Sequence, residues 1–462
     1  MKRDMRKRKV AGILVLVLLI IVVQPVIPAE SQQETGMFEV DGLRVIFKPV
    51  AGETVGVQLF FDGGVTKQTE ENQGIDAFLM SASMRGSEKY PKDKLISELT
   101  KMGTAMGTDA SYDYTTAYIR SVKKNFESSW DIFVDLLSNP LLEESEVELV
   151  RSQLISAARQ KRDSPDSYVF DLANSMLYEG HPYALDPYGV EESLRNITIE
   201  DLRDHNGELL TKSRMLLVIV GDFTQREVER YASAFASLPE GEEGGLLNKI
   251  NKIVEKIMET SRRLLPRTSQ ECSNLLGRAE TEEKFTYAPL EIPNTYVRGV
   301  FRAPGMDNPD YYAACIALDI LSDTLFEEVR TKRNMAYSVS SGLSSRRDNY
   351  GVVAVTTNTP DEALNVMKSV IEEMKIEGVS AERVEEAVNG YITSFYLSNE
   401  NTLSQAYQLG LWELNGGGWE KSFEFVDNLR KIKPEDVKDF LNTYIKDITT
   451  AAVGGQSLSV KL

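Results

Sequence analysis

The same order of secondary-structure signals occurs twice in this 462-residue chain. A strand pattern at Val55–Phe61 leads into helical and paired-strand patterns, and Tyr296–Ala303 begins the same order again. Late in each copy, Arg195–Asp201 (RNITIED) corresponds to Arg430–Asp436 (RKIKPED). Corresponding elements stay roughly 230–238 residues apart, which indicates a duplicated domain. The chain is therefore predicted to be α+β, with two homologous halves, each an antiparallel-rich sheet with helices on one face.

A chain of this length is too long for a single core, so several domains are expected. The repeat places an N-terminal half at 30–236 and a C-terminal half at 286–462. Residues 237–285 interrupt the pattern and are predicted to be a linker, with a charged amphipathic helix at Asn248–Thr260.

The N-terminus has the pattern of an export signal. Six basic side chains lie between Lys2 and Lys9, and the apolar run Val10–Val23 follows them. Residues 1–29 are therefore predicted to be a signal peptide, with Ala29 as a cleavage point, or an N-terminal anchor through residues 10–28. The length of the run leaves the choice open. Either way the chain is predicted to be exported, and thus periplasmic or extracellular.

The charge balance excludes some classes of partner. Removing the six basic and one acidic side chains of residues 1–29 from the net charge of −18 leaves about −23. So acidic a chain is unsuited to nucleic acid or to an anionic membrane surface. No nucleic-acid partner is expected, and membrane contact is expected only through the N-terminal segment.

Histidine and cysteine are scarce. His181 and His205 are the two histidines, so a histidine-rich metal site is excluded. Cys272 and Cys315 are too few for a disulfide framework. Whether they pair stays open, although Cys315 lies in an apolar helical run and is interpreted as a small core residue.

The most informative stretch is Asn72–Ser87, which reads NQGIDAFLMSASMRGS. Gly74 can begin a turn, after which Ile75, Phe78 and Leu79 share one face of a short helix. Taken alone, this is the pattern of an ordinary core helix.

In its frame, however, the stretch resembles the insulinase/pitrilysin-type metallopeptidases, or inverted zincins. Their pattern here is roughly N-x-G-x-A-H-F-L-E-H-M-x-x-x-G-[ST]. The frame is matched at Asn72, Gly74, Phe78, Leu79, Gly86 and Ser87. The two histidine positions hold Ala77 and Ser81, and the general-base position holds Met80. The third zinc ligand of the family, a Glu on the helix at Glu143–Arg162, is replaced by Ala157.

These replacements remove the chemistry of the family. The mechanism needs two histidines one helical turn apart to hold zinc, and a Glu to deprotonate the metal-bound water. Alanine has no ligand atom, serine is a poor zinc ligand, and a Met thioether accepts no proton near neutral pH. The resemblance therefore predicts the fold, a clam-like chamber formed by the two halves, with no metal, no cofactor and no catalytic residue in this chain alone.

A second family motif is kept in the C-terminal half. The family has an Arg and a Tyr seven residues apart, and Arg330 and Tyr337 occupy these positions, although Asn334 replaces the usual Gly. The resemblance implies that the two side chains bind the substrate carbonyl and the tetrahedral intermediate, for which a guanidinium and a phenol are suitable donors. The alternative is an ordinary ion pair for Arg330 and packing for Tyr337.

The combination favours a non-catalytic subunit of a metalloendopeptidase. In part of the family, one chain carries H-x-x-E-H and its partner carries the Arg/Tyr pair. This chain resembles the partner, so it is expected to pair with a zinc-bearing homologue in a heterodimer or larger assembly that cleaves peptides. The alternative is a structural or assembly subunit with the same fold and no role in proteolysis. A zinc peptidase with displaced ligands is disfavoured, because the chain has only two histidines.

Overall fold

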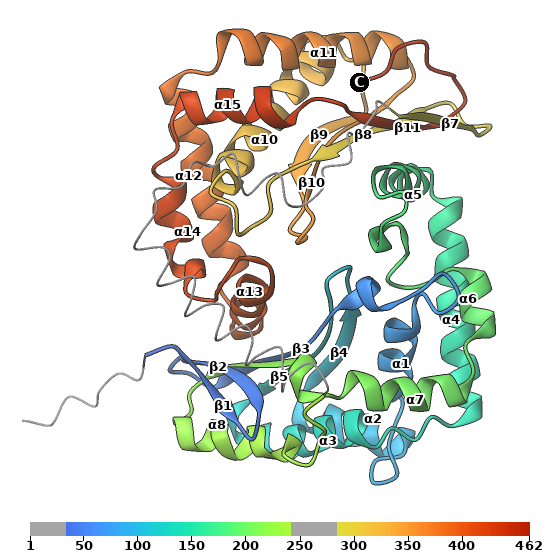
Figure 1. Ribbon diagram of the computed structural model, residues 1–462, viewed down its shortest axis with the longest axis vertical. Helices are drawn as coiled ribbons and strands as arrows, with labels where there is room; N and C mark the ends of the chain where they lie inside the picture. The colour runs from blue at the N-terminus through green and yellow to red at the C-terminus, as the bar shows by residue number, and fades with distance from the viewer. Residues whose placement is uncertain (1–33, 242–283) are drawn as a thin grey trace, which may run out of the picture. The chain divides into compact units, whose positions relative to one another are not determined.

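The computed structural model describes residues 34–241 and 284–462 (Figure 1). The predicted export signal (1–29), the predicted helix Asn248–Thr260 and Cys272 lie outside these ranges. From Thr35 onward, the described residues form one compact unit. No helix in the described part of the chain has the length and apolarity needed to span a bilayer.

The described residues of the first half contain a six-stranded sheet in the order β1-β2-β6-β3-β5-β4. Its strands are β1 (Gly36–Val40), β2 (Leu43–Pro49), β6 (Met215–Gly221), β3 (Thr54–Asp62), β5 (Tyr114–Val122) and β4 (Ala105–Ala110). The β2–β6 pair is parallel, and the other neighbours are antiparallel. In the second half, the described sheet has the order β7-β11-β8-β10-β9. Its strands are β7 (Phe285–Pro289), β11 (Thr449–Gly454), β8 (Thr295–Arg302), β10 (Tyr350–Thr357) and β9 (Ser338–Leu343).

The two sheets share one topology. In the first sheet, β6 pairs in parallel with β2 and antiparallel with β3. In the second sheet, β11 pairs in the same way with β7 and β8. The first sheet differs by the additional hairpin strand β1. The predicted α+β fold with two homologous halves is thus confirmed.

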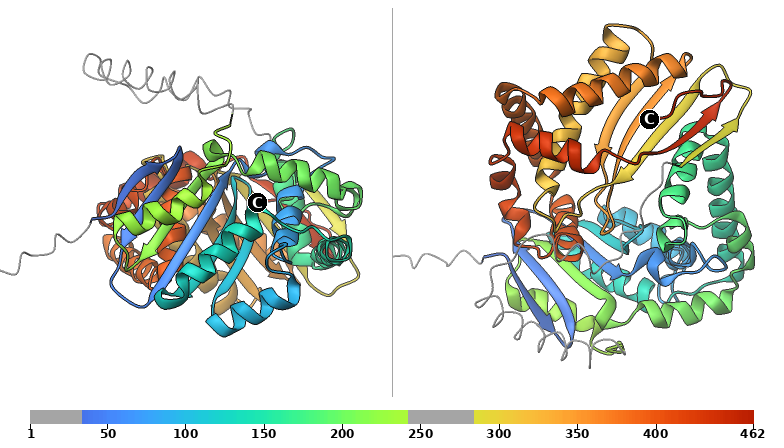
Figure 2. Two further views of the ribbon diagram at one scale, coloured as in Figure 1. Left: turned by 90° about the horizontal axis from the view of Figure 1, so that it is seen from below. Right: turned by 45° about the horizontal axis from the view of Figure 1, so that its top comes forward.

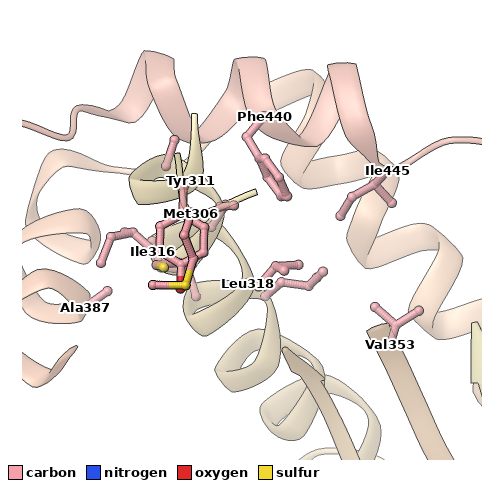
Figure 3. Close-up of a cluster of buried hydrophobic side chains, with 14 of the residues drawn as sticks. Met306, Tyr311, Ile316, Leu318, Val353, Ala387, Phe440 and Ile445 are labelled. Carbon is pink, nitrogen blue, oxygen red and sulfur yellow. The ribbon is translucent and has the colours of Figure 1, made fainter. Parts of the chain in front are cut away.

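Helices surround both sheets. In the first half they are α1 (Ile75–Ser83), α2 (Lys92–Met102), α3 (Phe126–Ser138), α4 (Glu144–Asp163), α5 (Pro165–Leu177), α6 (Glu191–Asn196), α7 (Ile199–Leu209) and α8 (Gln225–Ala232). In the second half they are α10 (Tyr311–Leu325), α11 (Pro360–Glu377), α12 (Ala381–Ser398), α13 (Thr402–Asn415), α14 (Lys421–Leu429) and α15 (Pro434–Tyr444). Side chains of α10, α12, α15 and β10 meet in the core of the second half (Figure 3).

The halves exchange one helix each. Alternate residues of β6 point to opposite faces: Leu217 joins the core of the first half, whereas Val218 joins a cluster with Leu409 of α13. Conversely, Val169 of α5 packs with Val453 of β11 in the second sheet. Figures 1 and 2 show α5, in green, along the second sheet, whose strands are coloured yellow to red. The expectation of helices on one face of each sheet is therefore incomplete, because the other half supplies a helix to the second face.

The loop between β9 and β10, residues 344–349, also joins the halves. Arg346 is 8 % exposed. Its guanidinium carbon lies 3.3 Å from the ring centroid of Tyr112 and 4.8 Å from that of Tyr350. The same guanidinium donates a 2.7 Å hydrogen bond to Oδ1 of Asn174. Burial raises the pKa of Tyr112 to about 12, so this ring stays neutral and in contact with the cation.

Asp113 of the first half anchors the same loop. Its carboxylate is buried and accepts the backbone N–H of Arg347 at 3.1 Å and the side-chain amide of Asn415 at 3.0 Å. It also accepts the hydroxyl of Tyr183. Because a buried carboxylate needs several donors, these hydrogen bonds fix the loop and the end of α13 to the first half.

Candidate functional site

The degenerate zinc motif lies on α1, as the sequence predicts. Gly74 precedes the helix with φ of 89°, and its N–H donates to the side chain of Gln68 at 2.8 Å. A Cβ at Gly74 would come within 2.5 Å of the Cα of Gly189, so only glycine fits there. The matched glycine of the frame is thus explained by backbone conformation and by a close approach.

The four degenerate positions do not form a metal site. Ala77 and Met80 are 3 % and 1 % exposed. Ser81 is partly buried, and Ala157 is exposed on α4. Helices α1 and α4 still pack together, with the guanidinium of Arg151 lying 4.9 Å from the ring centroid of Phe78. Across the described residues, no group of three or more His, Cys, Asp or Glu side chains is placed to hold a metal ion.

A buried polar pair lies directly beside the degenerate motif positions of α1. Asp76 is 1 % exposed and lies 2.6 Å from Nε2 of His205 on α7. It also accepts a 2.8 Å hydrogen bond from the hydroxyl of Thr115. Nδ1 of His205 lies 3.5 Å from a carboxylate oxygen of Glu208. Sequence analysis missed this pair, although an Asp stands where the family pattern has a small residue, and that departure was the available signal.

The other histidine has a local structural role. Nδ1 of His181 accepts the backbone N–H of Tyr183 at 3.2 Å. Its ring makes an edge contact with the ring of Tyr183, with centroids 4.7 Å apart. These contacts fix a short turn after α5.

Tyr337 directly precedes β9 and has an exposed side chain. Its backbone N–H donates to Thr356 O at 2.9 Å, while its side chain leaves the residue 77 % exposed. The preceding Asn334 has φ of 51°, a left-handed conformation that glycine adopts freely and asparagine tolerates. This conformation explains why Asn can replace the Gly of the family motif.

Arg330 is also exposed, on the π-helical turn Phe326–Thr331 (η6), which follows α10 and packs against β9. Its guanidinium carbon lies 5.0 Å from the ring centroid of Phe326. Among the described residues, no carboxylate forms an ion pair with Arg330 and no acceptor takes a hydrogen bond from its side chain.

Neighbouring cations differ in this respect. Lys332 and Arg333 donate to the carboxylate of Glu328 at 2.6 and 2.5 Å. These hydrogen bonds hold the pKa of Glu328 below its ordinary value. Glu327, the other carboxylate of this turn, lies 3.1 Å from Nζ of Lys332. Both carboxylates of the turn thus pair with other cations, and the charge of Arg330 is left available. In contrast to the zinc-motif positions, both Arg330 and Tyr337 present donors to the surface of the chain.

Comparison with known proteins identifies the family. The model for "Insulinase (Peptidase family M16)" matches residues 44–189, and that for "Peptidase M16 inactive domain" matches residues 196–391. Cytochrome b-c1 complex subunit 1 of Caenorhabditis elegans is 22 % identical over 450 residues, which cover 94 % of this chain and 90 % of the relative. Mitochondrial-processing peptidase subunit beta of Dictyostelium discoideum is 21 % identical over 432 residues, which cover 89 % and 86 %.

A solved structure, a peptidase M16 inactive domain from Pseudomonas fluorescens, shares the fold. It superposes with a TM-score of 0.78 at 18 % identity, covering 93 % of this chain and all of that one. With the repeated sheet topology and the degenerate α1 motif, these matches confirm the resemblance inferred from the sequence. The chain belongs to the insulinase-type peptidase family M16, as a member without the H-x-x-E-H zinc motif.

Proposed function

We propose that this chain is an exported, catalytically inactive subunit that pairs with a zinc-bearing homologue and supplies Arg330 and Tyr337 to a shared peptide-cleaving site. One contrast carries the proposal. Ala77 and Met80 are buried and offer no zinc ligand, whereas Arg330 and Tyr337 are exposed and Arg330 has no anionic partner among the described residues. A group that stabilises a developing oxyanion must have free donors, and these two side chains have them.

The partner is inferred from what the chain lacks. A hydrolytic site of this family needs a metal and a general base, and neither is offered by the motif positions of this chain. One relative is named as a subunit of the mitochondrial-processing peptidase, so subunit organisation occurs among the relatives. The clam-like chamber between the two halves of this chain, and a cleavage chamber to which the partner contributes a second wall, belong to the same proposal.

A second function is favoured by a different match. Another relative is named as a subunit of the cytochrome b-c1 complex, a name that refers to a complex and not to a peptidase. A scaffold subunit would need the fold and the outer surface of the chain but would not need Arg330 or Tyr337. The two functions are therefore separated by substitutions at these two residues.

The test has two steps. Affinity purification of the full chain from the exported fraction should recover a homologous chain that bears H-x-x-E-H. Absence of the chain from that fraction would contradict export, and absence of such a partner would contradict pairing. Peptide cleavage by the purified pair is then measured for wild type, Arg330→Ala and Tyr337→Phe, with complex formation checked separately.

Tyr337→Phe keeps the ring and removes one donor, so kcat is expected to fall by about 10²–10³, as for the loss of one oxyanion donor. Two exposed residues supply matched controls. Tyr396→Phe removes a phenol that is on α12, and Arg226→Ala removes a guanidinium that is on α8. Both controls should leave kcat unchanged. Normal cleavage by Arg330→Ala and Tyr337→Phe in intact pairs would contradict the role of these residues in cleavage and would favour the scaffold function.

A further inference from the structure

Phe326 is a large apolar residue that the fold leaves half exposed. Its neighbours Leu325 and Val329 are fully buried in the core of the second half, whereas Phe326 is 44 % exposed. Packing therefore does not account for an aromatic ring at this position. The ring instead lies against the guanidinium of Arg330, with 5.0 Å between the guanidinium carbon and the ring centroid.

An exposed arginine otherwise samples many rotamers, and ordering it costs free energy when it binds a ligand. A cation over an aromatic face is held by electrostatic attraction, which restricts these rotamers before any ligand arrives. The contact with the ring does not engage the N–H groups of the guanidinium in hydrogen bonds, and no described residue accepts a hydrogen bond from the Arg330 side chain. The guanidinium is thus held in place while its donors remain free.

The backbone around this pair is also fixed. Phe326 and Arg330 share the π-helical turn η6, a rare conformation that is frequent at functional sites. The N–H of Asn334 donates to Arg330 O at 2.9 Å, and that of Met335 donates to Val329 O at 3.0 Å. These bonds fold the following loop back onto the turn, just before Tyr337 and the first residue of β9.

We infer that Phe326 is a positioning residue, which holds the guanidinium of Arg330 ready to receive a peptide carbonyl or the oxyanion formed from it. The inference rests on the proposed function and adds to it a residue that was not predicted from the sequence. Phe326 acts through Arg330 and needs no contact with the substrate.

The first measurement uses the isolated full chain. Side-chain NMR of Arg330, assigned by comparison with Arg330→Lys, should show an upfield ring-current shift. Phe326→Leu, which keeps apolar bulk without a ring, should abolish the shift, and Phe326→Tyr should retain it. Absence of the shift in the wild-type chain would overturn the inference whatever the chain's function is.

The second measurement is peptide cleavage by the purified pair. Phe326→Leu should lower kcat about two- to five-fold, the range expected for an exposed cation–π contact. Phe326→Tyr, which keeps an aromatic ring, should have the kcat of the wild type. The matched control is Phe423→Leu, because Phe423 is 51 % exposed and also carries a cation, Lys48, at 5.5 Å. This control should leave cleavage unchanged.

A double-mutant cycle separates the inference from the proposed function. In an Arg330→Ala background, Phe326→Leu should have no further effect, because Phe326 acts through that guanidinium. An equal loss in both backgrounds would overturn the positioning role. If Arg330→Ala slows cleavage and Phe326→Leu does not, only the inference fails. If Arg330→Ala cleaves normally in an intact pair, the proposed function fails and the positioning role fails with it.

Discussion

Met80 occupies the position of the family's general base, and it lies in the hydrophobic core of the first half with Phe78 and Leu79. The side chain that replaces a catalytic carboxylate is therefore an apolar group packed in the core. A carboxylate at this position would lose its hydration among the apolar side chains of this core. The packing around position 80 thus disfavours a carboxylate there.

Replacing Met80 by Glu is expected to lower the free energy of unfolding by on the order of 3 kcal/mol or more, because the carboxylate would be buried among apolar side chains. Urea denaturation of the full chain measures the change. The control is Ser81→Glu on the same helix, where the side chain is partly exposed and the cost should stay below about 1 kcal/mol. Equal destabilisation by the two substitutions would show that position 80 is not part of the core.

At the level of secondary-structure elements, the sequence predicted much of the fold. Alternating and helical patterns identified the strands and helices, and the repeat identified their common topology, because both signals are local or recur at a fixed spacing. The exchange of α5 and α13 between the halves could not be predicted in this way. Each helix packs on a strand far away in the chain, and its amphipathic pattern does not specify which sheet it covers.

For the candidate site too, the sequence predicted which residues occupy the motif positions but not the contacts that depend on tertiary structure. The family frame located Ala77, Met80, Arg330 and Tyr337, because it is a pattern of residue types at fixed spacing. The contact of Phe326 with Arg330 and the buried pair beside α1 depend on side-chain geometry, which no spacing encodes. The assignment of Arg330 and Tyr337 to substrate binding stays a proposal.

Gly56 is a residue whose identity reflects the packing of α13 on the first sheet. It lies on β3, where a Cβ would come within 2.3 Å of the backbone nitrogen of Leu403 on α13. Gly56→Ala would therefore push α13 away from the sheet, with an expected loss of about 1–3 kcal/mol in the free energy of unfolding. Gly390 is the matched control, since it lies in α12 and a Cβ there would meet no atom within 4 Å apart from its chain neighbours and the backbone of its own helix. Gly390→Ala should stabilise the chain by about 0.5–1 kcal/mol, because alanine is the better helix former. A neutral Gly56→Ala would contradict the close packing of α13 on β3.

For the molecule as a whole, the exchanged helices and the 344–349 loop make the two halves depend on each other. Without α13, the face of β6 that carries Leu216 and Val218 would be exposed to water, and without α5 the face of β11 that carries Val453 would be exposed. Exposed apolar faces of this kind cause aggregation. The repeated topology suggests two independent domains, but the packing argues that neither half is stable alone.

This dependence predicts how the two described ranges behave as separate chains. Fragments 34–241 and 284–462 should each aggregate when expressed alone, and should form a soluble one-to-one complex when expressed together. Arg346→Ala in the second fragment should weaken that complex about tenfold or more, because it removes a buried, charged hydrogen bond to Asn174 of the first fragment. Arg430→Ala is the control, since Arg430 is exposed and pairs only with Asp427 of its own helix region among the described residues. Size-exclusion chromatography and a binding titration of the co-expressed pair measure both effects. A single fragment that is soluble and unfolds cooperatively on its own would show that the halves are independent domains, and would contradict the structural role of α5, α13 and the loop.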